Sequence, residues 1–221
     1  MIATAVRSVS RESSAHRVAR AISELTSGRP VVMLGGSAHA PDGNLVFPAE
    51  LATTATLTFA IEHTSGFICV ALPAGECDRL CLPPMYSTYA AAAGVSYTVT
   101  VDAAAGISTG ISARDRARTI RLLGSAQSLP CDFSRPGHVV PCSVPDTAFP
   151  RRGSCAEAAV DIVDAAGLRP AAAFCALVSG RDPHRMAGLA ELRDFAILHS
   201  LAVTSVDDVA DCLEDICTSP S

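Results

Sequence analysis

The sequence has 221 residues, of which 49% are hydrophobic and 18% are charged, and this excludes a chain that is disordered throughout. The formal net charge is −5, whereas a protein that grips a phosphate backbone needs a basic face, so we expect no nucleic-acid partner. All 17 of the basic side chains counted as Lys and Arg are arginines, which excludes Schiff-base chemistry and lysine-linked pyridoxal cofactors.

Nine cysteines are spread along the chain, and they indicate free thiols in a reducing cytoplasm. Their number is odd, the chain is too large to depend on disulfide bonds, and no spacing is typical of a four-ligand zinc site. The N-terminal segment lacks a hydrophobic signal core, and no apolar run reaches the roughly 18 residues that span a bilayer. We therefore expect a cytoplasmic protein with no membrane partner.

The first elements in chain order are an arm and a helix. Residues 1–13 are rich in serine and arginine and predict a flexible N-terminal arm. Ser13 or Ser14 can then cap a helix whose apolar residues recur at i, i+4 and i+7, and Gly28 ends it.

The rest of the chain alternates between short apolar segments, typical of strands, and segments of helical periodicity. In order these are a strand at 31–34, a Gly-rich polar loop at 35–44, a helix near 49–62, strands at 67–70 and 97–102, a helix capped by Ser112, a strand at 138–142, a helix at 155–166, a buried strand at 171–178, and helices at 190–199 and 206–216. Strands interleaved with helices predict an α/β fold, an α+β layered arrangement included. Because neither a repeat nor a linker divides the chain, we expect a single domain over residues 14–217.

Five segments occur in the order and spacing of one enzyme family: HTSGFICV (63–70), CDRLCLPPM (77–85), YTVTVDAAAGISTGISARDRARTIRLL (97–123), FSRPGHVVP (133–141) and RRGSCAEAAVDIVDAAGLRPAAAFCALV (151–178). With these segments the chain resembles 3,4-dihydroxy-2-butanone 4-phosphate synthase, from about Val18 to about Leu213. The resemblance implies that family's α/β domain, usually a homodimer with two active sites near the subunit interface. It also implies the family reaction, in which ribulose 5-phosphate gives the four-carbon riboflavin precursor and formate, with magnesium.

The resemblance also shows where the chain departs from the family. The acidic loop typical of the family reads Asp-Asp-Glu-Asp-Arg-Glu-Asn-Glu-Gly-Asp, and residues 35–44 here read GGSAHAPDGN. By position, His39 replaces a substrate-binding Arg, Ala40 replaces the metal-binding Glu, and Asn44 replaces an Asp that touches substrate. Later in the chain, Cys155 replaces the second metal ligand, a His, and Ala176 replaces the catalytic Glu.

These replacements bear directly on the chemistry. Magnesium prefers hard oxygen ligands, which alanine and cysteine do not supply. Without the cation an enediolate loses its main charge stabiliser, and without the Glu it loses a proton shuttle. We therefore expect no metal and no cofactor, and failure of the family reaction on ribulose 5-phosphate. Alanines at positions 40, 156 and 176 also predict a wider, more apolar cavity for a bulkier small-molecule substrate.

The candidate site consists of the polar residues that remain at matched positions. His138 matches the family's essential histidine, and Cys155 begins a helix whose dipole lowers the pKa of a thiol. Each residue also has a structural alternative: His138 as a hydrogen-bond partner, Cys155 as a buried packing thiol, and Asp42 as a turn residue. The predicted catalytic residues are His138, Cys155, His39 and Asp42, and the predicted substrate-binding residues are Arg152, Ser154, Cys69 and Asn44.

Three functions are compatible with these residues. The leading prediction is a repurposed, metal-independent enzyme that isomerises, cyclises or cleaves a small carbonyl-containing metabolite through an enol, in a specialised biosynthetic pathway and as a homodimer. The second is a catalytically dead paralogue that binds a ligand or regulates a riboflavin enzyme. The third is a true synthase of riboflavin biosynthesis with a rebuilt metal site.

Overall fold

The computed structural model describes residues 12–35, 42–86, 95–146, 153–182 and 184–218, with side chains up to residue 213. Its strands are β1 (Val31–Leu34), β2 (Gly43–Pro48), β3 (Cys69–Pro73), β4 (Ser96–Tyr97), β5 (Val101–Ala103), β6 (Phe133–Val144), β7 (Ala172–Ala176) and β8 (Val203–Ser205). They form one mixed sheet of order β4-β6-β3-β7-β2-β1-β8, and β5 pairs with β6 beside it. The pairs β3–β6 and β1–β8 are parallel and the others are antiparallel.

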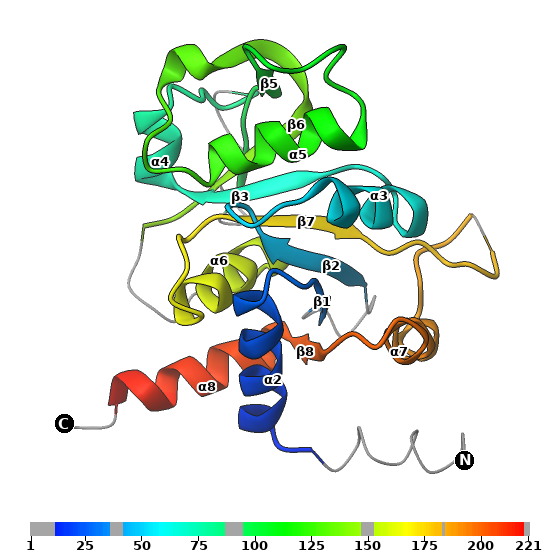
Figure 1. Ribbon diagram of the computed structural model, residues 1–221. Helices are drawn as coiled ribbons and strands as arrows, with labels where there is room; N and C mark the ends of the chain where they lie inside the picture. The colour runs from blue at the N-terminus through cyan, green and yellow to red at the C-terminus, as the bar shows by residue number, and fades with distance from the viewer. Residues whose placement is uncertain (1–11, 36–41, 87–94, 147–152, 183, 219–221) are drawn as a thin grey trace.

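Helices cover both faces of this sheet (Figure 1). They are α2 (Ser14–Thr26), α3 (Thr54–His63), α4 (Ala74–Arg79), α5 (Ala113–Leu123), α6 (Cys155–Ala165), α7 (Leu189–Leu198) and α8 (Val206–Thr218), with a 3₁₀ turn at Pro130–Asp132. One buried cluster joins the sheet to α2, α6 and α8, and a second joins its other face to α3, α4 and α5. The layered α/β domain expected from the sequence is confirmed. The boundaries 14–217 stay a prediction, and most of the expected arm lies outside the described residues.

Most predicted elements are present, and their caps are the expected ones. The Ser13 side chain accepts a hydrogen bond from the His16 amide (3.3 Å), and the Ser112 side chain accepts one from the Asp115 amide (3.1 Å). The sequence reading missed β2, α4 and β8. Strand β2 is buried at every position, so it lacks the alternation of polar and apolar residues that marks a half-exposed strand.

The segment at 97–102 was wrongly expected to be one strand. It divides into β4 and β5 because Thr98 bridges to Pro84 and the pairing of β5 with β6 shifts register between Val101 and Asp102. Strand β6, by contrast, is longer than the predicted 138–142, since its first half pairs with β5 and its second half with β3 and β4. Within the described segments, no helix has both the length and the apolar character needed to cross a membrane.

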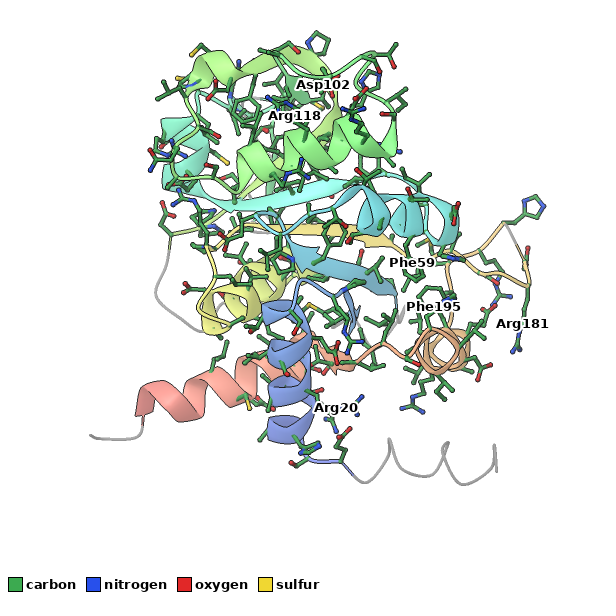
Figure 2. All side chains as sticks on the ribbon, viewed as in Figure 1. Arg20, Phe59, Asp102, Arg118, Arg181 and Phe195 are labelled. Carbon is green, nitrogen blue, oxygen red and sulfur yellow. The ribbon has the colours of Figure 1, made fainter. Side chains whose placement is uncertain are left out.

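Helix α7 packs on α3 through four rings, of which Figure 2 labels Phe59 and Phe195. The ring centroids of Phe59 and His63 are 4.6 Å apart, those of His63 and His199 4.7 Å, and those of Phe195 and His199 4.5 Å. Burial, followed by the charge of His63, lowers the pKa of His199 from its ordinary value of 6.5. The folded protein therefore favours a neutral His199.

This lowered pKa predicts that acid weakens the fold at the α3–α7 contact. The unfolded chain takes up the proton more readily, so the stabilisation is complete above pH 6.5 and is lost as the pH falls through the folded-state pKa. We expect the drop in melting temperature between pH 7.5 and pH 5 to be smaller by about 2 °C in His199→Phe, measured by circular dichroism. The same change at exposed His184 should leave that drop as in the wild type, and an equal drop in His199→Phe would contradict the prediction.

Candidate active site

A carboxylate and an imidazole form a close pair where β5 meets β6. Asp102 Oδ2 lies 2.7 Å from His138 Nδ1, and Asp102 Oδ1 accepts the His138 backbone N–H at 3.0 Å. The Asp102 side chain is 8% exposed and that of His138 is 41% exposed. A carboxylate only accepts, so Nδ1 carries the hydrogen and Nε2 is left available to exchange a proton with a bound molecule.

A glycine and the N-terminal end of α5 hold this pair in place. A Cβ atom on Gly110 would lie 2.1 Å from Asp102 Oδ2 and 2.8 Å from His138 Nδ1, and its φ of +88° is one that side chains rarely adopt. The Gly110 N–H donates to Asp115 Oδ2 at 3.2 Å, which ties this loop to α5. Only glycine lets the backbone approach the pair so closely.

A second group of predicted residues gathers where α6 begins over the sheet. The Asn44 side chain is buried and hydrogen-bonds to the thiol of Cys155, and Asp42 lies close enough to act on that thiol electrostatically. Strand β7 connects these residues through the sheet, because Asn44 of β2 pairs with Ala176 and Cys69 of β3 pairs with Phe174. The structure therefore brings Asn44, Cys155 and Asp42 together, and Cys155 packs against the core cluster that contains Cys69.

The surroundings of Cys155 act against the expected activation by the helix dipole, and its catalytic role stays a prediction. Burial, the largest effect, and the charge of Asp42 together raise its pKa from 9.0 to about 12, although the hydrogen bond from Asn44 acts in the opposite direction. Desolvation of the thiolate outweighs the dipole at the start of α6. The alternative of a packing thiol is the one that fits.

Cys155 should therefore react slowly with an alkylating agent. Cys81 and Cys131 are free and exposed, so at pH 8 we expect iodoacetamide to modify them about 100-fold faster than Cys155, as measured by peptide mass spectrometry. The denatured protein, in which all thiols are exposed, provides the reference rate. Labelling of Cys155 in the folded protein as fast as that of Cys81 would refute the assignment.

Of two other predicted substrate-binding residues, Ser154 caps a helix and Cys69 is buried in the core. The Ser154 hydroxyl accepts from the Glu157 amide (3.2 Å) and contacts Glu157 Oε2 (2.8 Å), so it is the N-cap of α6 in a reciprocal capping box. Cys69 is buried, and burial raises its pKa to about 12. Ala156, expected to widen the cavity, is 4% exposed and packs in the core.

The predicted residues His39 and Arg152 lie outside the described residues. The others fall into two groups, because Figure 2 shows Asp102, the partner of His138, in the layer formed by β5 and α5, on the side of β3 away from α6. Asp102 itself was missed by the sequence reading. Its signal was available: it is the carboxylate that ends the alternating segment 97–102, which the fold places against the strand carrying His138.

Comparison with known proteins places this geometry in a family. Residues 19–212 match the family model described as 3,4-dihydroxy-2-butanone 4-phosphate synthase. The chain belongs to this synthase family. A riboflavin biosynthesis protein RibBA of Nocardia farcinica is 47% identical over 192 residues, covering 87% of this chain and 46% of the relative, and one of Salinispora arenicola is 45% identical. The chain thus spans about half the length of the curated relatives it matches.

Solved synthase structures agree with this assignment. A 3,4-dihydroxy-2-butanone 4-phosphate synthase of Candida albicans superimposes with a TM-score of 0.80 and 33% identity, covering 88% of this chain and 95% of the other. A synthase in complex with two magnesium ions gives a TM-score of 0.77 and 34% identity, covering 86% and 93%. The synthase fold expected from the resemblance is therefore confirmed.

The synthase relatives overturn the leading functional prediction. A repurposed, metal-independent enzyme of a specialised pathway was expected, yet relatives nearly half identical over 87% of the chain are named for riboflavin biosynthesis. Those names agree with the third alternative instead. The replaced loop residues predicted a change of function that the similarity of the whole domain does not support. The coarser expectation of an enzyme with a small-molecule substrate agrees with the synthase family.

Proposed function

We propose that this chain is a synthase of riboflavin biosynthesis that converts ribulose 5-phosphate into 3,4-dihydroxy-2-butanone 4-phosphate and formate. The observation that carries the proposal is the 47% identity to a RibBA protein over 87% of the chain. The reaction needs no oxidant and no water, because the two products together contain all the atoms of the substrate.

The Asp102–His138 pair supplies an acid–base group of the kind this reaction needs. Removing a proton next to a ketone gives an enediol, and proton transfers must follow before the carbon skeleton rearranges and formate leaves. His138 can take up and return protons through Nε2, while Asp102 fixes the ring and its tautomer. Proton transfer by His138 and its orientation by Asp102 both use side chains that the structure already aligns.

The described residues do not fit the magnesium ion that the synthase family implies. Within the described ranges, no group of three or more His, Cys, Asp or Glu side chains is arranged to hold a metal ion. At the start of α6 the candidate ligand is the Cys155 thiol, which is hydrogen-bonded to the Asn44 side chain. A thiol is a soft ligand, whereas magnesium prefers oxygen ligands. We therefore assign no step to a metal.

The decisive experiment supplies ribulose 5-phosphate to the purified protein and measures formate with a coupled dehydrogenase, with and without added magnesium. Release of formate and the four-carbon phosphate at many turnovers per site supports the proposal. Absence of formate under both conditions, together with saturable binding of ribulose 5-phosphate by calorimetry, would contradict it and indicate a ligand-binding member of the synthase family.

Assembly as a homodimer is part of this proposal. Large apolar side chains remain exposed around β4, where the Met85 amide donates to the Tyr97 carbonyl at 2.8 Å; these are Met85, Tyr86 and Tyr97. Light scattering is expected to give twice the chain mass of 22.8 kDa at micromolar concentration. Tyr97→Glu should lower that mass, and a wild-type mass of one chain would exclude the dimer.

A further inference from the structure

A cavity of about 340 Å³ lies at the carboxyl ends of β1 and β8. The two strands are parallel, α8 begins directly after β8, and α2 packs on both β8 and α8 (Figure 1). In open α/β sheets, the carboxyl ends of parallel strands and the helix N-termini that follow them are the usual places for anionic ligands. None of the predicted site residues in the described part of the chain lines this cavity, so it is separate from the candidate active site.

One wall of the cavity contains a hydroxyl group that lacks a hydrogen-bond partner. Thr204 of β8 lines the cavity and is 0% exposed, and among the described residues no atom forms a hydrogen bond with its Oγ1. A buried hydroxyl without a partner costs stability, whereas valine has nearly the same shape and carries no such cost. An acceptor group on a molecule in the cavity supplies the missing partner, so the threonine indicates a ligand.

Two arginines and one carboxylate give the lining of the cavity a net positive charge. Arg17 donates to both carboxylate oxygens of Asp208, with its Nε 2.8 Å from Oδ2, so this pair is neutral as a whole. Arg193 of α7 is exposed, and within the described ranges its guanidinium has no hydrogen-bond or ion-pair partner. Asp207, the other acidic residue in the first turn of α8, does not line the cavity. The charge of Arg193 is therefore available to an anion.

We propose that this cavity binds the phosphate group of a small molecule, at a site separate from that of the proposed reaction. Arg193 supplies a charged donor, Thr204 a hydroxyl donor, and the first amides of α8 the partial positive charge of a helix N-terminus. These donors come from α7, β8 and α8, and donors on several sides suit a tetrahedral oxyanion better than a planar carboxylate. Leu34 and Val203 add apolar lining, and the volume leaves room for an organic group beside the phosphate.

The test titrates isotope-labelled protein with inorganic phosphate and, separately, with phenyl phosphate, and follows the backbone amide signals by NMR. We expect saturable shifts at Ser205, Val206 and Asp207 with both probes. Tighter binding of phenyl phosphate identifies a phosphate ester as the ligand, because its ring can contact the apolar lining, and equal affinities identify free phosphate. Absence of saturable shifts at these three amides would overturn the proposal.

Three variants test the lining of the cavity. Arg193→Met should weaken the binding of phosphate by about 10-fold, as expected for loss of a charge-assisted hydrogen bond, and Thr204→Val by about 5-fold. Arg114→Met is the matched control, because it removes the same charge from an exposed arginine on α5, and it should leave the Kd unchanged. An equal loss of affinity in Arg114→Met would contradict a specific site.

Thr204→Val also distinguishes a ligand-binding hydroxyl from a structural one. Without phosphate, this variant should melt at the wild-type temperature or above, because its hydroxyl has no partner to lose. A lower melting temperature together with an unchanged affinity for phosphate would show that the hydroxyl is structural, and would overturn its assignment to the site. These measurements need no turnover, so they stand whether or not the protein releases formate.

Discussion

Replacing His138 by alanine is expected to lower kcat for formate release by about 10²- to 10⁴-fold, the usual contribution of a general acid–base group. The orientation of the imidazole is fixed, because the Asp102 carboxylate accepts hydrogen bonds from both Nδ1 and the backbone N–H of His138. Its loss removes the proton carrier and leaves the rest of the site unchanged. The effect should therefore fall on kcat, with a small change in KM.

A matched substitution distinguishes loss of the proton carrier from loss of its orientation. Asp102→Asn retains the shape of the side chain but can no longer enforce the same tautomer of His138, so kcat should fall by less than in His138→Ala, and the double variant should be no worse than His138→Ala alone. Circular dichroism confirms that each variant is folded. A folded His138→Ala with wild-type kcat/KM would remove His138 from the mechanism.

The largest effect on stability is expected at Gly137, beside His138. A Cβ atom there would lie 2.0 Å from the Val101 carbonyl carbon and 2.2 Å from the Asp102 amide nitrogen, and both are backbone atoms that cannot rotate away. Gly137→Ala must separate β5 from β6, and we expect a loss of about 3 kcal/mol or more in the free energy of unfolding, measured with urea. That is a large part of the total stability of a typical domain.

Gly180→Ala is the control for this substitution. No atom lies within 4 Å of a Cβ built on Gly180, and its φ is outside the left-handed region, so its free energy of unfolding should stay within about 0.5 kcal/mol of the wild type. If Gly137→Ala were as stable as Gly180→Ala, the close approach of β5 and β6 around the active pair would be wrong.

The sequence was informative where local signals decide the structure. Ser13 and Ser112 cap the helices they were expected to cap, and the apolar segment at 31–34 is β1. Such elements depend on capping, spacing and β-branched residues within a few positions. Strand β2, one of the two strands that were missed, is buried at every position, so it lacks the alternation of polar and apolar residues that marks a half-exposed strand.

The site was harder to predict because its contacts join distant segments. Asp102 and His138 are 36 positions apart, and only the pairing of β5 with β6 brings them together. The prediction for Cys155 misled for another reason: the start of a helix lowers the pKa of a thiol in solvent, but Cys155 is half-buried against the core and its pKa is raised. Burial and long-range pairing are properties of the folded chain, and a one-dimensional pattern carries little of either.

The shared strand β6 also determines how the molecule can come apart. The first half of this strand carries His138 and pairs with β5, and the second half lies between β3 and β4 in the main sheet. A continuous ladder of backbone hydrogen bonds thus passes from one layer to the next, and neither layer can melt without exposing the ladder of the other. The layer formed by β5 and α5 is therefore not a separable module. A substitution that breaks β6 is therefore expected to destabilise both layers together.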